Sequence, residues 1–219
     1  MLGIVCGFES EARVARLFTP LVACSGALEN VARAGAERLV QQGATTLLSF
    51  GVAGGLSPNL TPKNLVIGNR VTDADGRSWR CDEKLVEVLA TALPQAKKGG
   101  VFGSKVLIPS PQQKHPLFDR TGCLIVDMES QAVAEVASRH PIRFAVLRGL
   151  SDTVDESFPP AALAGIKPDG SMNLGGILLS LLKQPGQFPA LMRLGKNTKL
   201  ALKNLRDAVP QVQPLLSQY

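Results

Sequence analysis

Three acidic residues, one arginine and a glycine loop are the parts of this sequence most suited to chemistry. The carboxyl groups of Glu11, Glu129 and Asp152 can hold or transfer a proton, and the guanidinium of Arg148 can bind an anion or place a water molecule. Their combination favours a functional site over separate structural roles. Each stands in a segment that follows a short apolar run, and the segments are Gly7–Glu11, Gly51–Leu56, Asp127–Ser130 and Arg148–Asp152.

Short apolar runs alternate with longer segments of helical period, which is the pattern of an α/β protein. In an open α/β sheet the ligand crevice lies outside the carboxyl ends of the strands, so the four polar segments are expected at one rim. The runs expected as strands are Leu2–Cys6, Leu21–Cys24, Thr46–Phe50, Leu65–Ile67, Val101–Val106, Leu124–Val126 and Phe144–Leu147. The segments expected as helices are Glu9–Leu17, Leu28–Gln42, Glu83–Ala92 and Met128–Ser138.

Two stretches between these elements are predicted to be surface loops. Asp73–Arg80 is polar and contains one glycine, and Pro109–Pro116 contains three prolines. Glycine and proline favour turns because one tolerates positive φ and the other has a fixed φ and no N–H donor.

Each candidate residue also has a structural explanation without chemistry. Glu11, Glu129 and Asp152 could stand at helix starts, where carboxylates complement the helix dipole and cap free N–H groups. Arg148 could be an exposed charge at a strand end, and Ser151 could cap a helix. The glycine segment could be a tight turn, and its spacing is not the GxGxxG of a dinucleotide-binding fold.

The composition is that of a folded globular protein, with 45% hydrophobic and 19% charged residues. A length of 219 residues predicts a single domain over residues 1–219. The net charge of +6 admits an anionic partner, but aromatic residues at 5% disfavour nucleic acid, which is often bound by stacking. Four scattered cysteines, without a CxxC pair or zinc-site spacing, indicate a cytoplasmic protein without a metal site. No apolar run reaches the roughly 20 residues of a transmembrane helix.

Positive charge is concentrated toward the C-terminus. From residue 176 to residue 219, six lysines and arginines stand against one aspartate. An amphipathic helix is predicted at about 188–207, with basic residues on one side and a stripe formed by Leu191, Leu194, Thr198, Leu202 and Leu205 on another. Such a helix could lie on an anionic membrane surface, or its stripe could pack on the domain while the basic residues face solvent.

Four segments together resemble the signature segments of the nucleoside phosphorylase and nucleosidase superfamily. They read GIVCGFESE at 3–11, SFGVAGGL at 49–56, VDMES at 126–130 and VLRGLSD at 146–152, in the order of the family. FPPAAL at 158–163 and QPGQFPAL at 184–191 are most similar to the hopanoid-associated phosphorylases of that superfamily. The resemblance implies an α/β fold of three layers around a mixed, partly closed sheet.

The resemblance also implies roles in breaking a purine N-glycosidic bond. Asp152 matches the residue that gives a proton to N7 of the purine, and Ser151 would orient it. Glu129 matches the residue that binds the ribose hydroxyls and stabilises a cationic sugar. Further substrate contacts would come from Met128 and Phe8 near the ribose, Val106 and Leu107 beside the purine, and Gly51 and Val52 of the glycine loop.

The attacking group could be water or phosphate. Hexameric bacterial purine phosphorylases have arginines at the positions of Glu11 and Ser49 and a serine at that of Val52, so two cationic phosphate contacts are missing here. Glu11 would repel phosphate but could accept a proton from water, with Arg148 helping to place that water. We therefore expect hydrolysis, with phosphorolysis to a ribose 1-phosphate as the alternative.

The subfamily resemblance implies release of adenine from an adenosine with a large apolar 5′ group, namely adenosylhopane in hopanoid biosynthesis, without a cofactor. Methylthioadenosine, adenosylhomocysteine and futalosine are the alternatives within the superfamily. The resemblance further implies a homodimer, and a lipid-linked substrate would favour peripheral contact with the inner face of the membrane. A different class of function is a non-catalytic module that binds a membrane or nucleic acid, with salt-sensitive binding and no base release.

Overall fold

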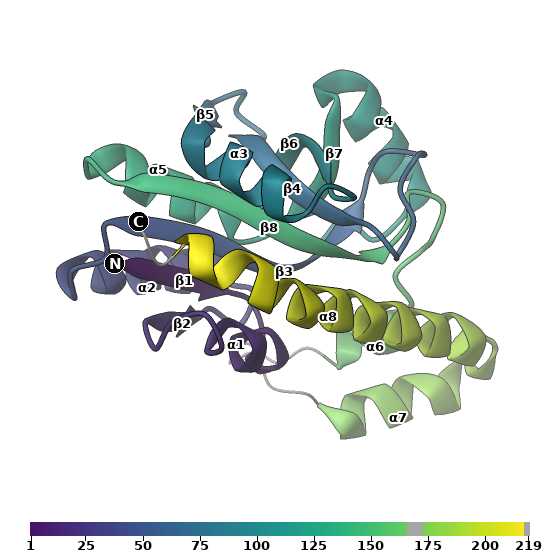
Figure 1. The fold of residues 1–219 in the computed structure, drawn as a ribbon. Coiled ribbons are helices and arrows are strands. Elements are labelled where there is room, and N and C mark those ends of the chain that lie inside the picture. The colour runs from purple at the N-terminus through teal and green to yellow at the C-terminus, as the bar shows by residue number, and fades with distance from the viewer. Residues whose placement is uncertain (166–172, 217–219) are drawn as a thin grey trace.

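The computed structural model describes residues 1–165 and 173–216, which are organised around a sheet of eight strands (Figure 1). The strands are β1 (Leu2–Cys6), β2 (Val22–Cys24), β3 (Thr46–Gly55), β4 (Leu65–Thr72), β5 (Ser78–Arg80), β6 (Lys97–Gly103), β7 (Cys123–Asp127) and β8 (Arg143–Asp152). The helices are α1 (Glu9–Ala15), α2 (Glu29–Gln41), α3 (Glu83–Ala92), α4 (Pro111–Thr121), α5 (Ser130–Arg139), α6 (Pro160–Ala164), α7 (Leu174–Lys183) and α8 (Phe188–Leu216), with a 3₁₀ turn at Pro185–Gln187.

The sheet mixes parallel and antiparallel pairs and is closed along part of its length. Its main path runs β2-β1-β3-β7-β6-β4-β5. Strand β8 lies off this path and pairs with β3 in parallel and with β4 in antiparallel orientation. Strands β3, β7, β6, β4 and β8 therefore form a ring. This confirms the predicted α/β fold with a mixed, partly closed sheet.

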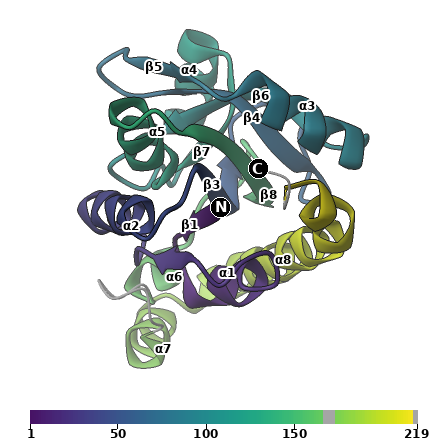
Figure 2. The ribbon, with the colours of Figure 1, turned by 60° about the vertical axis from the view of Figure 1, so that its left-hand side comes forward.

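Helices cover the sheet on two sides, as Figure 2 shows. Helix α2 packs beside α5, and α8 contacts both α1 and α3. Helix α8 also lies against β8, where a methyl group on Gly149 would come within 3.0 Å of the Ala201 side chain. Because glycine allows this close approach, α8 supports the strand that carries Arg148, Ser151 and Asp152.

Several strands have different bounds from those that their apolar runs predict. Strand β3 continues beyond Phe50 through the glycine segment, and β8 continues beyond Leu147 to Asp152. The two extensions pair with each other, so backbone hydrogen bonds keep residues in strands that hydrophobicity alone does not mark. The candidate residues Gly51, Arg148 and Asp152 therefore lie within strands rather than after them.

Both predicted loops contain regular structure, so these two predictions are wrong in part. Residues 78–80 form β5, which pairs with β4, and Gly76 at φ 81° lies in the turn between them. Residues 111–121 form α4, because Pro111 stands in the first turn, where a missing N–H has no helical acceptor. Lys114 and Leu117 are buried on one side of this helix and anchor it.

The basic helix predicted at about 188–207 extends further and forms α8. Its C-terminal half packs on the domain, where Ala201, Leu205 and Val209 are buried. The predicted apolar stripe therefore packs against the rest of the protein at Leu205, which agrees with the alternative in which the stripe is buried and the basic residues face solvent. Within residues 1–165 and 173–216, no helix is both long enough and apolar enough to cross a membrane.

Candidate active site

Glu11 is buried in the first turn of α1 and accepts three hydrogen bonds from backbone N–H groups. Its Oε2 accepts from Gly7 at 2.7 Å and from Phe8 at 2.9 Å, and its Oε1 accepts from Val52 at 2.8 Å. The first two contacts satisfy free N–H groups at the helix start, while the third ties α1 to β3. Burial raises the pKa of Glu11, against the opposing effects of Arg148 and these N–H groups. A carboxylate can accept about four hydrogen bonds, so one position remains for a water molecule.

Two glycines make room for carboxylates at this point. Gly51 has a φ of 145°, and a methyl group there would lie 2.5 to 2.7 Å from the carboxyl atoms of Glu11. A methyl group on Gly7 would lie 2.8 Å from Oε1 of Glu129 and 3.3 Å from Oε2 of Glu11. The carboxyl groups of Glu11 and Glu129 therefore border the same glycine, although they come from distant parts of the chain.

Arg148 is a fully buried cation beside these carboxyl groups. Its Nη2 donates to Oε2 of Glu129 at 3.0 Å and to Oγ of Ser49 at 2.7 Å, and its Nε lies 2.8 Å from Oδ2 of Asp127. The alternative of an exposed charge at a strand end is wrong, because β8 runs inside the sheet and places Arg148 among acidic partners. We name Glu11, Glu129, Asp127 and Arg148 the carboxylate–arginine cluster.

The side chain of Glu129 faces Arg148 and does not cap α5. Oδ1 of Asp127 accepts the N–H groups of Ser130 at 2.9 Å and Glu129 at 3.3 Å instead. Burial raises the pKa of Glu129 to about 8; Arg148 opposes the shift, whereas the negative charges of Asp127 and Glu11 add to it. Glu129 is therefore easier to protonate than an exposed glutamate, and positive charge that develops nearby favours its ionised form.

A second polar cluster lies at the end of β8. The register between β3 and β8 shifts after Ala53, so Gly54 stands opposite Asp152 and Ser151 is passed over. Such a bulge redirects side chains. Oγ of Ser151 lies 2.7 Å from Oδ1 of Asp152 and 3.1 Å from the carbonyl oxygen of Ala53. The capping alternative is wrong for Ser151 and Asp152, because both belong to β8 rather than to a helix start.

Lys114 completes this second cluster and is not among the residues predicted from the sequence. From α4 its ammonium donates to Oδ2 of Asp152 at 2.5 Å, and the lysine side chain is only 1% exposed. Burial raises the pKa of Asp152, while Lys114 and Ser151 oppose that shift. The one available signal was the helical spacing of Lys114 and Leu117, which the neighbouring prolines obscured. We name Asp152, Ser151 and Lys114 the aspartate–lysine cluster.

The two clusters lie along the same strand. Glu11 approaches β3 at Gly51 and Val52, and Asp152 approaches it at Gly54, where a methyl group would lie 3.3 Å from Oδ2. Three residues of strand at 3.3 Å each separate Gly51 from Gly54 by about 10 Å. The fold thus brings the carboxyl groups of Glu11 and Asp152 to one stretch of β3, and Glu129 lies beside Glu11 at Gly7.

The other predicted substrate residues are less closely joined to these clusters. Phe8 is half-buried and contributes its N–H to Glu11, and Met128 is half-buried next to Glu129. Val106 is 64% exposed and lies beyond the end of β6. The prediction that a strand extends to Val106 is therefore wrong. The carbonyl oxygen of Val106 accepts a hydrogen bond from Oγ of Ser104, which folds this segment into a turn, and Leu107 follows half-buried.

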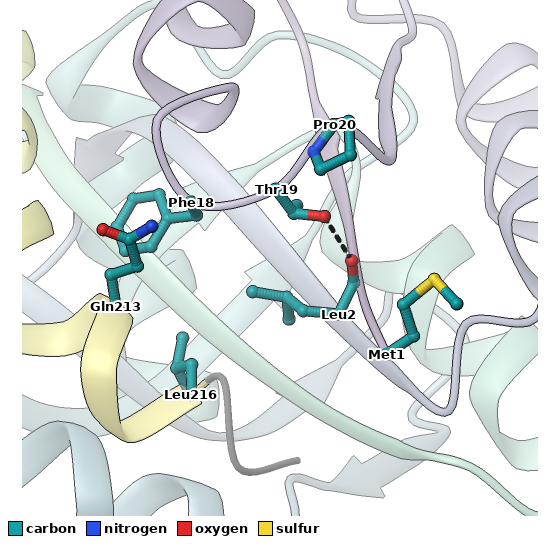
Figure 3. Close-up of a pocket in the computed structure, with 7 residues that line it drawn as sticks. All are labelled: Met1, Leu2, Phe18, Thr19, Pro20, Gln213 and Leu216. Atoms are coloured by element: carbon teal, nitrogen blue, oxygen red, sulfur yellow. Dashed lines mark hydrogen bonds between the residues drawn. The ribbon is translucent and has the colours of Figure 1, made fainter.

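Two cavities in the described part of the chain lie away from both clusters. One, of about 200 Å³, is bordered by the beginning of β1 and the end of α8, and there Oγ1 of Thr19 donates to the carbonyl oxygen of Leu2 (Figure 3). The other, of about 440 Å³, lies between β4, β5, β6 and α3. Among the residues that the structure describes, no group of three or more His, Cys, Asp or Glu side chains is placed to hold a metal ion.

Comparisons with known proteins agree with this fold. The 5′-methylthioadenosine/S-adenosylhomocysteine nucleosidase of Neisseria meningitidis superposes with a TM-score of 0.74 at 16% identity, over 96% of this chain and 97% of that chain. The futalosine hydrolase of Helicobacter pylori gives 0.68 at 18% identity, over 95% and 97%. The S-adenosylhomocysteine nucleosidase of Streptococcus pyogenes gives 0.68 at 16% identity, over 95% of both chains. No curated protein matches the sequence.

A match to a family as a whole extends over most of the chain. The sequence pattern of the phosphorylase superfamily matches residues 18–183 of this chain. This range includes the glycine loop, Glu129, Arg148 and Asp152. The chain belongs to the phosphorylase superfamily.

Proposed function

We propose that the protein is a purine nucleosidase that hydrolyses the N-glycosidic bond of a 5′-substituted adenosine. The observation that carries the proposal is the placement of two polar clusters along β3, with acidic groups at both. The aspartate–lysine cluster suits the purine, and the carboxylate–arginine cluster suits the sugar and the attacking water. Structures of similar fold that are named nucleosidases and a hydrolase support the same class of reaction.

Breaking the bond requires a proton on the leaving purine and a negative partner for the sugar. Asp152, held by Ser151 at Oδ1, would give the proton to N7. Glu129 would bind the ribose hydroxyls. As the C1′–N9 bond breaks, its electron pair leaves with the purine and the sugar becomes positively charged. That charge favours the ionised form of Glu129, which in turn stabilises the sugar cation.

Water suits the carboxylate–arginine cluster better than phosphate does. Glu11 can accept a proton from water, because burial raises its pKa above the usual range and one acceptor position is left. Arg148 already binds Asp127 and Glu129, so these carboxyl groups offset its attraction for phosphate. Phosphorolysis is the alternative, and the sugar product distinguishes the two reactions.

Release of free purine from a panel of 5′-substituted nucleosides tests the proposal. We expect purine and free sugar as products, at a rate that added phosphate does not change. Glu11→Gln should lower kcat about 100-fold, because the general base is lost while the polar side chain remains. Glu9→Gln is the matched control, since that carboxylate is about half exposed on the same helix and pairs with Arg16. An absolute need for phosphate, with a sugar 1-phosphate as product, would contradict hydrolysis.

For the substrate we propose an adenosine with a large apolar 5′ group, namely adenosylhopane. The support is the resemblance of residues 158–163 and 184–191 to the hopanoid-associated subfamily. Methylthioadenosine, adenosylhomocysteine and futalosine are the alternatives, and enzymes of similar fold are named for acting on these compounds. A series of 5′-alkyl adenosines separates them, since kcat/KM that rises with chain length supports the large apolar group.

We further propose that the enzyme is cytoplasmic and contacts an anionic membrane through α7 and the beginning of α8. These helices lie together along one side of the molecule (Figure 1). Their cations are exposed, and residues 173–206 contain no Asp or Glu. Apolar side chains flanked by cations favour anionic lipid. We name this the α7–α8 surface, formed by Leu178, Leu179, Leu182, Phe188 and Met192, each more than half exposed, with Lys183, Arg193, Lys196 and Lys199.

Sedimentation with lipid vesicles tests this surface. We expect binding to vesicles that contain phosphatidylglycerol and little binding to phosphatidylcholine alone. Lys196→Glu with Lys199→Glu should weaken binding about tenfold or more, because each cation near an anionic surface contributes about 1 kcal/mol. Leu17→Asp, at another exposed leucine, is the control. If light scattering instead shows a homodimer that dissociates when Leu178 and Leu182 become Asp, the surface belongs to a second copy and the membrane proposal is wrong.

A further inference from the structure

Lys114 uses all of its hydrogen-bonding capacity around Asp152. Its Nζ donates to Oδ2 of Asp152 at 2.5 Å and to the carbonyl oxygens of Thr153 and Glu156 at 2.8 Å each. An ammonium group has three N–H donors, so each donor has one partner. The side chains of Lys114 and Asp152 are 1% and 8% exposed. A buried cation in such surroundings is held in one place and is shielded from solvent.

Both oxygens of Asp152 have a polar partner in this arrangement. Oδ2 faces the ammonium of Lys114, and Oδ1 faces the hydroxyl of Ser151. The ammonium of Lys114 favours the ionised form of Asp152, and in that form Asp152 has no proton to give to a purine. The nearest acidic N–H belongs to Lys114.

We propose that Lys114 is a positioning residue that holds Asp152 and, through it, supplies the proton that the leaving purine takes. This inference rests on the proposed nucleosidase function. An N–H bond of Lys114 breaks as an O–H bond of Asp152 forms, and that O–H bond breaks as the N7–H bond forms. The electron pair of the C1′–N9 bond goes to the purine. Lys114 is then a neutral amine, which regains its proton through Asp152 from solvent that enters the site after the products leave.

The same three partners satisfy Lys114 in both protonation states. A neutral amine keeps two N–H donors for the carbonyl oxygens of Thr153 and Glu156 and presents its lone pair to a protonated Asp152. The proton can therefore move without leaving a buried polar group unsatisfied.

Other charges surround this pair. Glu156 accepts at Oε2 from the N–H of Thr153 at 2.9 Å, and Arg193 of α8 lies 3.9 Å from its Oε1. Asp155 pairs with His115 of α4 at the exposed side. These groups act on the pair from the loop after β8, from α8 and from α4, and they remain in place when Lys114 alone is changed.

Two substrates separate proton supply from a purely structural role. A purine nucleoside needs a proton on its leaving group, whereas a 4-nitrophenyl riboside has a leaving group that needs none. We expect Lys114→Met to lower kcat about 100-fold for the purine nucleoside and to leave kcat for the nitrophenyl riboside nearly unchanged. In a plot of kcat against pH for the purine nucleoside, the alkaline limb of Lys114→Met should lie at lower pH than that of the wild type. Without Lys114, only Asp152 molecules that are already protonated can give a proton to the purine. Lys84→Met, at an exposed lysine, is the control for loss of charge.

Lys114→Arg keeps a cation at this position but holds its proton more tightly. We expect it to restore the thermal unfolding midpoint and KM while kcat for the purine nucleoside stays low. Full recovery of kcat in Lys114→Arg, or equal losses for both substrates in Lys114→Met, would overturn the inference. If the wild-type protein releases base from neither substrate, the proposed function fails instead, so the two failures are distinguishable.

Discussion

Asp152→Asn is expected to lower kcat for purine release by about 1,000-fold, the largest effect on activity among the variants considered. The amide keeps the size of the side chain and can still accept from Ser151 or Lys114, but it cannot accept a proton and pass it to N7. The loss should therefore fall on kcat with a smaller change in KM. Steady-state assays of base release across a range of pH measure it.

Asp155→Asn is the matched control for that experiment. It removes a carboxylate three residues further along the chain, whose side chain is 76% exposed and pairs with His115. We expect its kcat to equal that of the wild type. Thermal unfolding of both variants shows whether the domain stays folded. An Asp152→Asn protein that is folded and fully active would remove Asp152 from the mechanism.

Arg148→Met is expected to cause the largest loss of stability, about 3–5 kcal/mol at neutral pH. Methionine fills much of the volume, but Asp127 and Glu129 lose the cation that binds both of them inside the protein. Arg143→Met, on the same strand and about half exposed, should change stability by less than about 1 kcal/mol. Denaturant unfolding of the three proteins measures the difference.

The loss in Arg148→Met should depend on pH. Because burial raises the pKa of Glu129 above its ordinary value of 4.5 to about 8, the folded state binds this proton more tightly than the unfolded state. The contribution of Glu129 to stability is therefore complete below about pH 4.5 and is lost as pH rises toward 8. Removing the cation raises the pKa further, so the variant should lose more stability at pH 8 than at pH 5. An equal loss at both values would show that Glu129 does not contribute to the pH dependence.

Much of the architecture could be predicted from the order of apolar runs. The strands β1 and β2 and the helices α2 and α3 lie close to their expected positions, because an apolar run marks each strand and a repeating apolar face marks each helix. The extensions of β3 and β8 were not predictable in this way, since glycine, serine and charged residues are kept in strands there by pairing with each other. Helix α4 was missed because local turn preferences of proline concealed a face that is buried in the folded chain.

The sequence by itself determined which residue types are available and where the apolar runs place them, and these sufficed to select Glu11, Glu129, Arg148 and Asp152 as candidates. Only the tertiary structure decided which of them share partners: Arg148 is buried between Asp127 and Glu129, and Asp152 pairs with Lys114 across 38 positions of sequence. The physical reason is that burial and neighbouring charge set the protonation of a carboxyl group. Both depend on packing between elements that are distant in the chain.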